Sequence, residues 1–216
     1  MAEDDELKLY CTLSGITIKV EVNTVNRGVL GEPIQMQLCE AAQKVFDSYC
    51  EVQAVPINQL FGGKLVAALD RQHPRDLFDC RKMLESTGYT NDIHTGFMFC
   101  ILSSKRPFHE ILKPRFIDQE AVFKSQFSGM TDEQFSYKMF EEVRLAICEK
   151  INASLSNADK ALLKSFAAGE PVWPDDDWSV YPGIQWKLIN IKKLKTSNYA
   201  KYEAQLNLLD KVLGLD

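Results

Sequence analysis

The hydrophobic pattern of this chain changes its period once, near residue 57, and this change limits the folds it can adopt. Before that point, apolar residues alternate strictly with polar ones, at Ile16, Ile18, Val20 and Val22. Such alternation is the period of a β-strand with one buried face. After residue 57, apolar residues recur every three or four positions, which is the period of amphipathic helices. Strands followed by helices indicate an α+β fold.

The expected strands lie in the first 56 residues. Residues 7–12 and 16–23 flank the turn signal Leu13-Ser14-Gly15 and predict a hairpin, and residues 34–39 and 52–55 predict two more short strands. Pro74 suits the first turn of a helix. Helices are expected at residues 58–70, 74–86, 92–104, 108–112, 131–153, 157–166 and 184–195, and in the tail through Tyr199, Tyr202, Leu206, Leu209 and Leu213.

Composition excludes several classes of protein. The chain has 216 residues, with 25 Lys and Arg against 30 Asp and Glu, a net charge of −5, so it is not a generally basic nucleic-acid coat protein. No apolar run reaches the roughly 18 residues that a membrane helix needs. The acidic start lacks the apolar stretch of a signal peptide, which makes the cytoplasm the expected compartment. The six cysteines form no Cys-x-x-Cys pair, and no zinc site is expected.

Residues 61–79, FGGKLVAALDRQHPRDLFD, hold the most informative charges. Lys64 and Arg71 are seven residues apart and share a helix face, with small alanines between them. Asp76 and Asp79 are three apart and share another face, and Arg75 could pair with Asp79. Together they suit the binding of phosphate next to an acid. The same spacing also fits solvated helix faces with exposed ion pairs.

This stretch resembles the signature of the AbiEii/AbiGii toxin family, nucleotidyltransferase-like proteins of the DNA polymerase β-like superfamily. The shared pattern is a lysine, a small-residue helix, an arginine, and then Arg-Asp-aromatic-Asp. The segments FAAGEPVW (166–173) and PGIQWKL (182–188), with the strand IKVEV (18–22), extend the resemblance over most of the chain. It implies a partial nucleotidyltransferase-like mixed sheet with its motif helices in residues 1–90, and a helical C-terminal domain in residues 91–216.

The resemblance also implies an activity, namely transfer of a nucleoside monophosphate from an NTP to a tRNA-like RNA, with Mg²⁺. Many such proteins are toxins of toxin–antitoxin or phage-defence loci, so an antitoxin protein is an expected partner. Lys64 would neutralise the triphosphate, and Asp76 would orient Lys64 or act as a base. Glu21 would be the third acid of the sheet and a candidate metal ligand. The candidate substrate-binding cations are Arg71, Arg75 and Lys19.

The chain departs from the family pattern at its start. The superfamily uses a Gly-Ser turn followed by Asp-x-Asp to hold its metals, and the first part of this chain has neither. We therefore expect a chain that begins after this segment and is weakly active or inactive alone. The alternatives are a non-catalytic module that binds nucleotide, RNA or protein, and a purely structural helical domain. A missing strand would expose a sheet edge and favour a homo-oligomer. Lysines 187, 192, 193 and 195 could contact RNA or form a solvated face.

Overall fold

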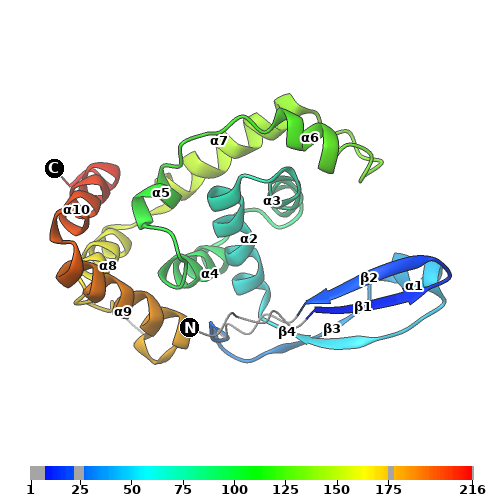
Figure 1. The fold of residues 1–216 in the computed structure, drawn as a ribbon, viewed down its shortest axis with the longest axis horizontal. Coiled ribbons are helices and arrows are strands. Elements are labelled where there is room, and N and C mark those ends of the chain that lie inside the picture. Colours follow the sequence, from blue (N-terminus) through cyan, green and yellow to red (C-terminus); the bar gives the residue numbers. More distant parts are fainter. Residues whose placement is uncertain (1–7, 22–26, 175–177, 216) are drawn as a thin grey trace.

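The computed structural model describes residues 8–21, 27–174 and 178–215. Two β-hairpins come first, and helices form the remainder, so the α+β prediction is confirmed. The hairpins extend from one end of the helical part (Figure 1). The predicted residues Val22 and Asn23 lie outside the described residues.

The first hairpin pairs β1 (Lys8–Leu13) with β2 (Ile16–Glu21) in antiparallel register. Its two-residue turn has positive φ at Ser14 and Gly15, the backbone geometry of tight hairpin turns. The prediction of a buried face is wrong, because every residue of both strands is exposed. Alternation makes one face apolar, but it does not supply an element to cover that face.

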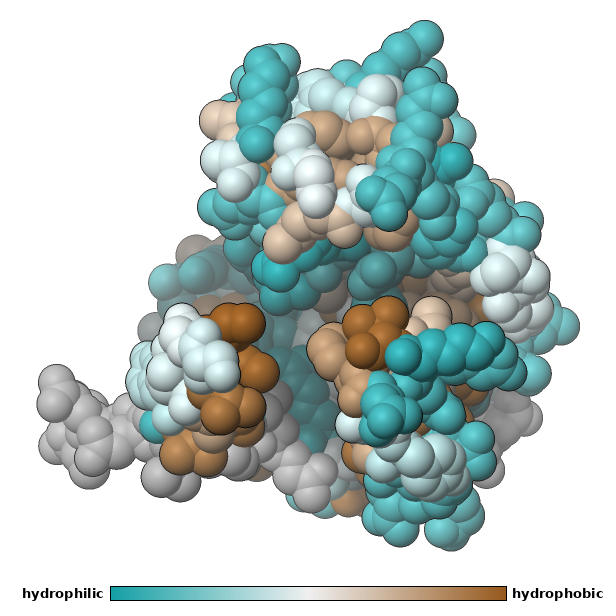
Figure 2. All heavy atoms as spheres, turned by 90° about the vertical axis from the view of Figure 1, so that its right-hand side faces the viewer, coloured by the Kyte–Doolittle hydropathy of each residue, from teal (hydrophilic) through white to brown (hydrophobic). Residues whose placement is uncertain are grey.

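The second hairpin pairs β3 (Ile34–Gln37) with β4 (Glu51–Ala54), again antiparallel. The described strands thus form two separate two-stranded sheets. Between them lies α1 (Glu40–Phe46), which the sequence analysis did not predict. Seen from this end of the molecule, hydrophobic side chains reach the surface in the lower half, where the hairpins lie (Figure 2).

The helical part begins with α2 (Ile57–Arg71), which crosses α4 (Asn91–Leu102) at backbone contact. A Cβ atom on Gly62 would lie 2.2 Å from the carbonyl carbon of Gly96, and one on Gly96 would lie 2.0 Å from the Asn58 carbonyl oxygen. These distances are far below van der Waals contact, so only glycine fits at either position. Gly62 is therefore required for the close packing of α2 against α4.

The other helices largely follow the predicted ranges. The predictions for α3 (Pro74–Ser86) and α5 (Phe108–Leu112) are confirmed to the residue, and the predicted cap at Ser156 is a capping box that begins α8 (Asn157–Ala167). The sequence analysis missed α6 (Glu120–Gln126) and began α7 (Tyr137–Ser154) six residues too early. A short 3₁₀ turn (Trp178–Val180), α9 (Pro182–Ser197) and α10 (Tyr199–Leu213) complete the described chain.

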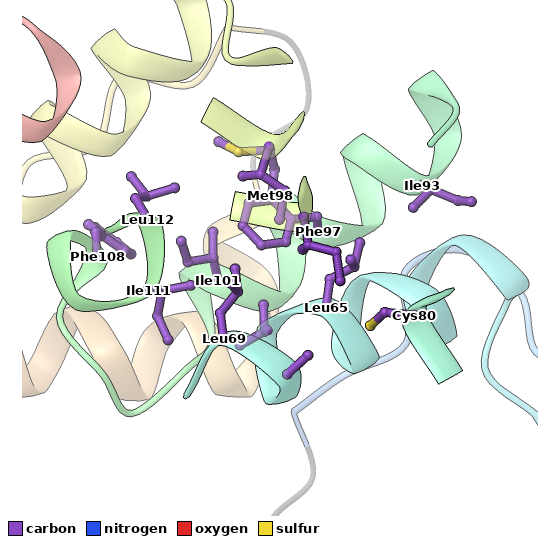
Figure 3. Close-up of a cluster of buried hydrophobic side chains, with 14 of the residues drawn as sticks. Leu65, Leu69, Cys80, Ile93, Phe97, Met98, Ile101, Phe108, Ile111 and Leu112 are labelled. Atoms are coloured by element: carbon purple, nitrogen blue, oxygen red, sulfur yellow. The ribbon is translucent and has the colours of Figure 1, made fainter. Parts of the chain in front are cut away.

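One hydrophobic core joins these helices. Leu65 and Leu69 of α2 pack with Phe97 and Ile101 of α4, and Ile111 of α5 closes the cluster (Figure 3). Helices from both sides of the predicted domain boundary at residue 90 share this core, and that boundary stays a prediction. Among the described residues, no helix has the length and apolar character needed to cross a membrane.

Candidate functional site

The candidate site lies where α2 turns into α3. Helix α2 ends at Arg71 and is capped by Gln72, whose left-handed backbone (φ 52°) reverses the chain, and α3 begins at Pro74. His73 caps α3, because its Nδ1 accepts the backbone N–H of Arg75 at 3.2 Å. The reversal places the charged face of α2 against the charged face of α3.

Two ion pairs join these faces. Lys64 Nζ donates to Asp79 Oδ2 at 2.6 Å, and Arg71 Nη2 donates to Asp76 Oδ1 at 2.9 Å. The four residues of the predicted motif therefore meet in space, as their spacing indicated. The pairing differs from the expectation that Asp76 orients Lys64. Asp79 holds Lys64, and Asp76 holds Arg71.

The two pairs differ in exposure. The Lys64 and Asp79 side chains are 37% and 43% exposed, and Arg71 is 64% exposed, so these three can reach a ligand. Asp76 is only 16% exposed, and its Oδ2 is buried with no hydrogen-bond partner in the described part of the chain. Asp76 is thus placed to position Arg71, and its second oxygen faces the protein interior.

Cys80 lies buried beneath the two pairs. Burial raises the pKa of its thiol to about 12, and the nearby carboxylates of Asp76 and Asp79 add to this effect, while Lys64 opposes it. The thiol stays protonated at neutral pH, and a protonated thiol is a poor nucleophile. Cys80 therefore acts here as a small apolar residue of the core.

Buried polar residues fix the turn between the helices. Gln72 Nε2 donates to the Arg115 carbonyl at 2.9 Å, and its Oε1 accepts from Arg144 Nη1 at 3.0 Å. Gln119 donates to the Arg71 carbonyl at 3.2 Å. Sequence reasoning missed this network, because Arg144 lies 72 residues from Gln72 and only the fold brings them together.

The remaining predicted site residues lie apart from these pairs. Arg75 is exposed, and the described residues show no ion pair between it and Asp79. Lys19 and Glu21 lie on β2, where they pair with each other on the polar face of the hairpin. That hairpin extends away from α2 and α3 (Figure 1), so the structure does not bring Lys19 and Glu21 to the site.

The acidic side chains of the site do not form a metal centre. Within residues 8–21, 27–174 and 178–215, no three His, Cys, Asp or Glu side chains gather as a metal site would require. Asp76 and Asp79 are each engaged by a cation, so they do not by themselves fit a two-metal centre.

The lysine cluster of α9 is only partly a surface feature. Lys187 is 6% exposed and donates to the carbonyls of Ile101 and Arg106 and to Ser104 Oγ, at 2.8–3.0 Å. Burial lowers the pKa of this ammonium well below its usual value. The suggestion that Lys187 contacts RNA or lies on a solvated face is wrong, whereas Lys192, Lys193 and Lys195 are exposed.

Comparison with known proteins identifies the family. Residues 5–188 match the family model described as "Nucleotidyl transferase AbiEii toxin, Type IV TA system". No curated protein and no solved structure matches. The matched range includes both ion pairs, the turn that joins them and most of the core. The chain belongs to the AbiEii nucleotidyl transferase toxin family.

Proposed function

We propose that this chain is a cytoplasmic toxin that transfers a nucleoside monophosphate from an NTP to the end of a tRNA-like RNA. The observation that carries the proposal is the double ion pair between α2 and α3 in a chain of this family. Two cations two turns apart on α2, each held by its own carboxylate, form a preorganised receptor for a polyphosphate. Family membership implies an NTP substrate and an antitoxin partner.

The residues take separate roles in this proposal. Lys64 and Arg71 bind the triphosphate and offset the negative charge that builds up as the phosphoryl group is transferred. The Asp79 side chain is 43% exposed, so its ion pair with Lys64 can open and release the ammonium to the triphosphate. Asp76 is a positioning residue that holds Arg71. Arg75 is exposed at the start of α3, where it could contact the RNA.

The test is transfer of α-labelled NTPs to total tRNA in the presence of Mg²⁺. Removing one preorganised cation is expected to reduce transfer by roughly 10²–10³-fold. The variants are Lys64→Ala and Arg71→Ala. The matched control is Lys82→Ala, which removes a half-buried lysine of α3 that pairs with Glu133. Transfer by the parent and the control, lost in both site variants, would support the proposal.

Two other results would change it. Transfer that survives both site variants would show that the reaction does not use these cations. NTP binding that depends on Lys64 and Arg71, without transfer under any condition, would favour the non-catalytic binding module. Measuring NTP binding by calorimetry alongside transfer separates the two results.

A further inference from the structure

A cavity lies away from the two ion pairs, between α5, α9 and α10. It has a volume of about 360 Å³, within the usual range for small-molecule sites. Helix α10 (Tyr199–Leu213) forms one wall and lies beyond the residues that the family model matches. This cavity is therefore not accounted for by the site proposed above.

The floor of the cavity is formed by the buried side chains of Phe108 and Lys187. Phe108 is 3% exposed, and the Lys187 ammonium lies 4.0 Å from the centre of its ring. All three N–H groups of a charged Lys187 are used by its three acceptors, the carbonyls of Ile101 and Arg106 and the hydroxyl of Ser104. Lys187 thus holds the turn after α4 against α9 and leaves no donor for a ligand.

The rim carries the charge that a ligand would meet. Lys105, before α5, and Lys201, on α10, both line the cavity and are exposed. Neither side chain has an ion pair or a hydrogen bond within the described part of the chain. The one carboxylate of the lining, Glu110, is paired with Arg106 at 3.3 Å, and Arg106 also pairs with Asp70. The uncompensated charge at the rim is positive, which favours an anion.

The wall adds a flat aromatic surface. Trp186 of α9 lines the cavity and is 45% exposed, whereas Trp173 and Trp178 pack against rings of the interior. An exposed indole beside cations suits a ligand that joins a planar ring to a phosphate. We propose that this cavity binds a nucleoside monophosphate, with the phosphate between Lys105 and Lys201 and the base against Trp186.

The proposal does not depend on the transferase activity, because it concerns binding at other residues. Calorimetry with AMP, GMP, CMP and UMP on the full chain tests it, and fluorescence of Trp186 gives a second readout. We expect at least one nucleotide to bind, and the Lys105→Ala/Lys201→Ala double variant to bind it at least about tenfold more weakly. Lys193→Ala, which removes an exposed lysine of α9 outside the lining, should bind as the parent does.

The ligand class is tested with the two halves of a nucleoside monophosphate, the phosphate and the nucleoside. Inorganic phosphate and the free nucleoside should each bind at least about tenfold more weakly than the monophosphate, because each lacks one set of contacts. The proposal is overturned if no monophosphate binds, if either half binds as well as the whole, or if binding is lost in Lys64→Ala and kept in the double variant. The Trp186→Phe variant should abolish the fluorescence change and keep the calorimetric signal.

Discussion

At the scale of single residues, Asp159 links two parts of the helical core. Its Oδ2 lies 3.1 Å from His94 Nε2 of α4 and also accepts from the backbone and hydroxyl of Ser156. Burial opposes its charge, but the hydrogen bonds from His94 and Ser156 outweigh this and lower the pKa of the carboxyl. The charged form of Asp159 is therefore favoured by folding.

This shift predicts an acid-sensitive contribution to stability. Because the folded pKa lies below the unfolded value of about 3.9, the contribution is present above that pH and is lost as pH falls through the folded pKa. Asp159→Ala should cost about 1–2 kcal/mol near pH 7, from the lost cap and hydrogen bonds. Thermal unfolding measured between pH 3 and 7 should show a smaller loss toward acid in the variant than in the parent. If the stability of parent and variant fell equally toward acid, Asp159 would not be the source of this pH dependence.

Arg144 is the residue that fixes the turn of the site from inside. It is 4% exposed, and it donates to Gln72 Oε1 and, at 2.7 Å, to the Ile117 carbonyl, while the Phe116 ring lies 4.4 Å away. Arg144→Met removes both donors, so the Ile117 carbonyl loses its donor and the buried Gln72 Oε1 keeps only the Ile117 N–H, at 3.2 Å. The expected cost is about 2–3 kcal/mol in urea unfolding, with NTP binding weakened by the loosened turn. An unchanged unfolding midpoint would show that the turn holds without this arginine.

At the scale of elements, the crossing of α2 and α4 gives a sharp comparison between adjacent glycines. Gly62→Ala would force a Cβ into the backbone of α4, whereas a Cβ on Gly63 would lie 3.7 Å from Cys100 Sγ, an ordinary contact. We expect Gly62→Ala to destabilise the chain by about 3 kcal/mol or more. Gly63→Ala should be neutral or stabilise it by up to about 1 kcal/mol, since alanine is the better helix former. If Gly62→Ala and Gly63→Ala changed the melting temperature equally, the close backbone contact between α2 and α4 would be disproved.

Some helices and strands could be predicted from the sequence, and others could not. The bounds of α3 were predictable because a proline marks its start, and Leu77 and Cys80 mark its apolar face. Charge spacing identified the residues of the two ion pairs, but their partners depend on how α2 and α3 meet. The exposed state of the first hairpin was not predictable, because alternation describes a strand and not its neighbours. Helix α1 and the hydrogen bonds of Gln72 with Arg115 and Arg144 were not predicted either. Short helices and hydrogen bonds between distant residues leave little local pattern in a sequence.

At the scale of the whole molecule, the first hairpin exposes an apolar face that no other described element covers. The pairs Leu9–Val20, Cys11–Ile18 and Leu13–Ile16 place six apolar side chains on one face. The five of these that are large apolar residues are 46–81% exposed. Among the described strands, β1 and β2 form a sheet of their own, so each is an edge strand of that sheet. An apolar face beside open edges favours association with another sheet.

We therefore propose that two copies of this chain associate through the first hairpin, and that one substitution on each face tests this. Ile18→Lys adds a charge to the apolar face and should shift the chain toward the monomer in light scattering across a concentration series. Thr17→Lys adds the same charge to the opposite face, where Thr17 meets Thr12, and should leave the dimer intact. A parent chain that stays monomeric at high concentration would refute the dimer. In that case the apolar face would be the first place to test for antitoxin binding, with the same pair of variants.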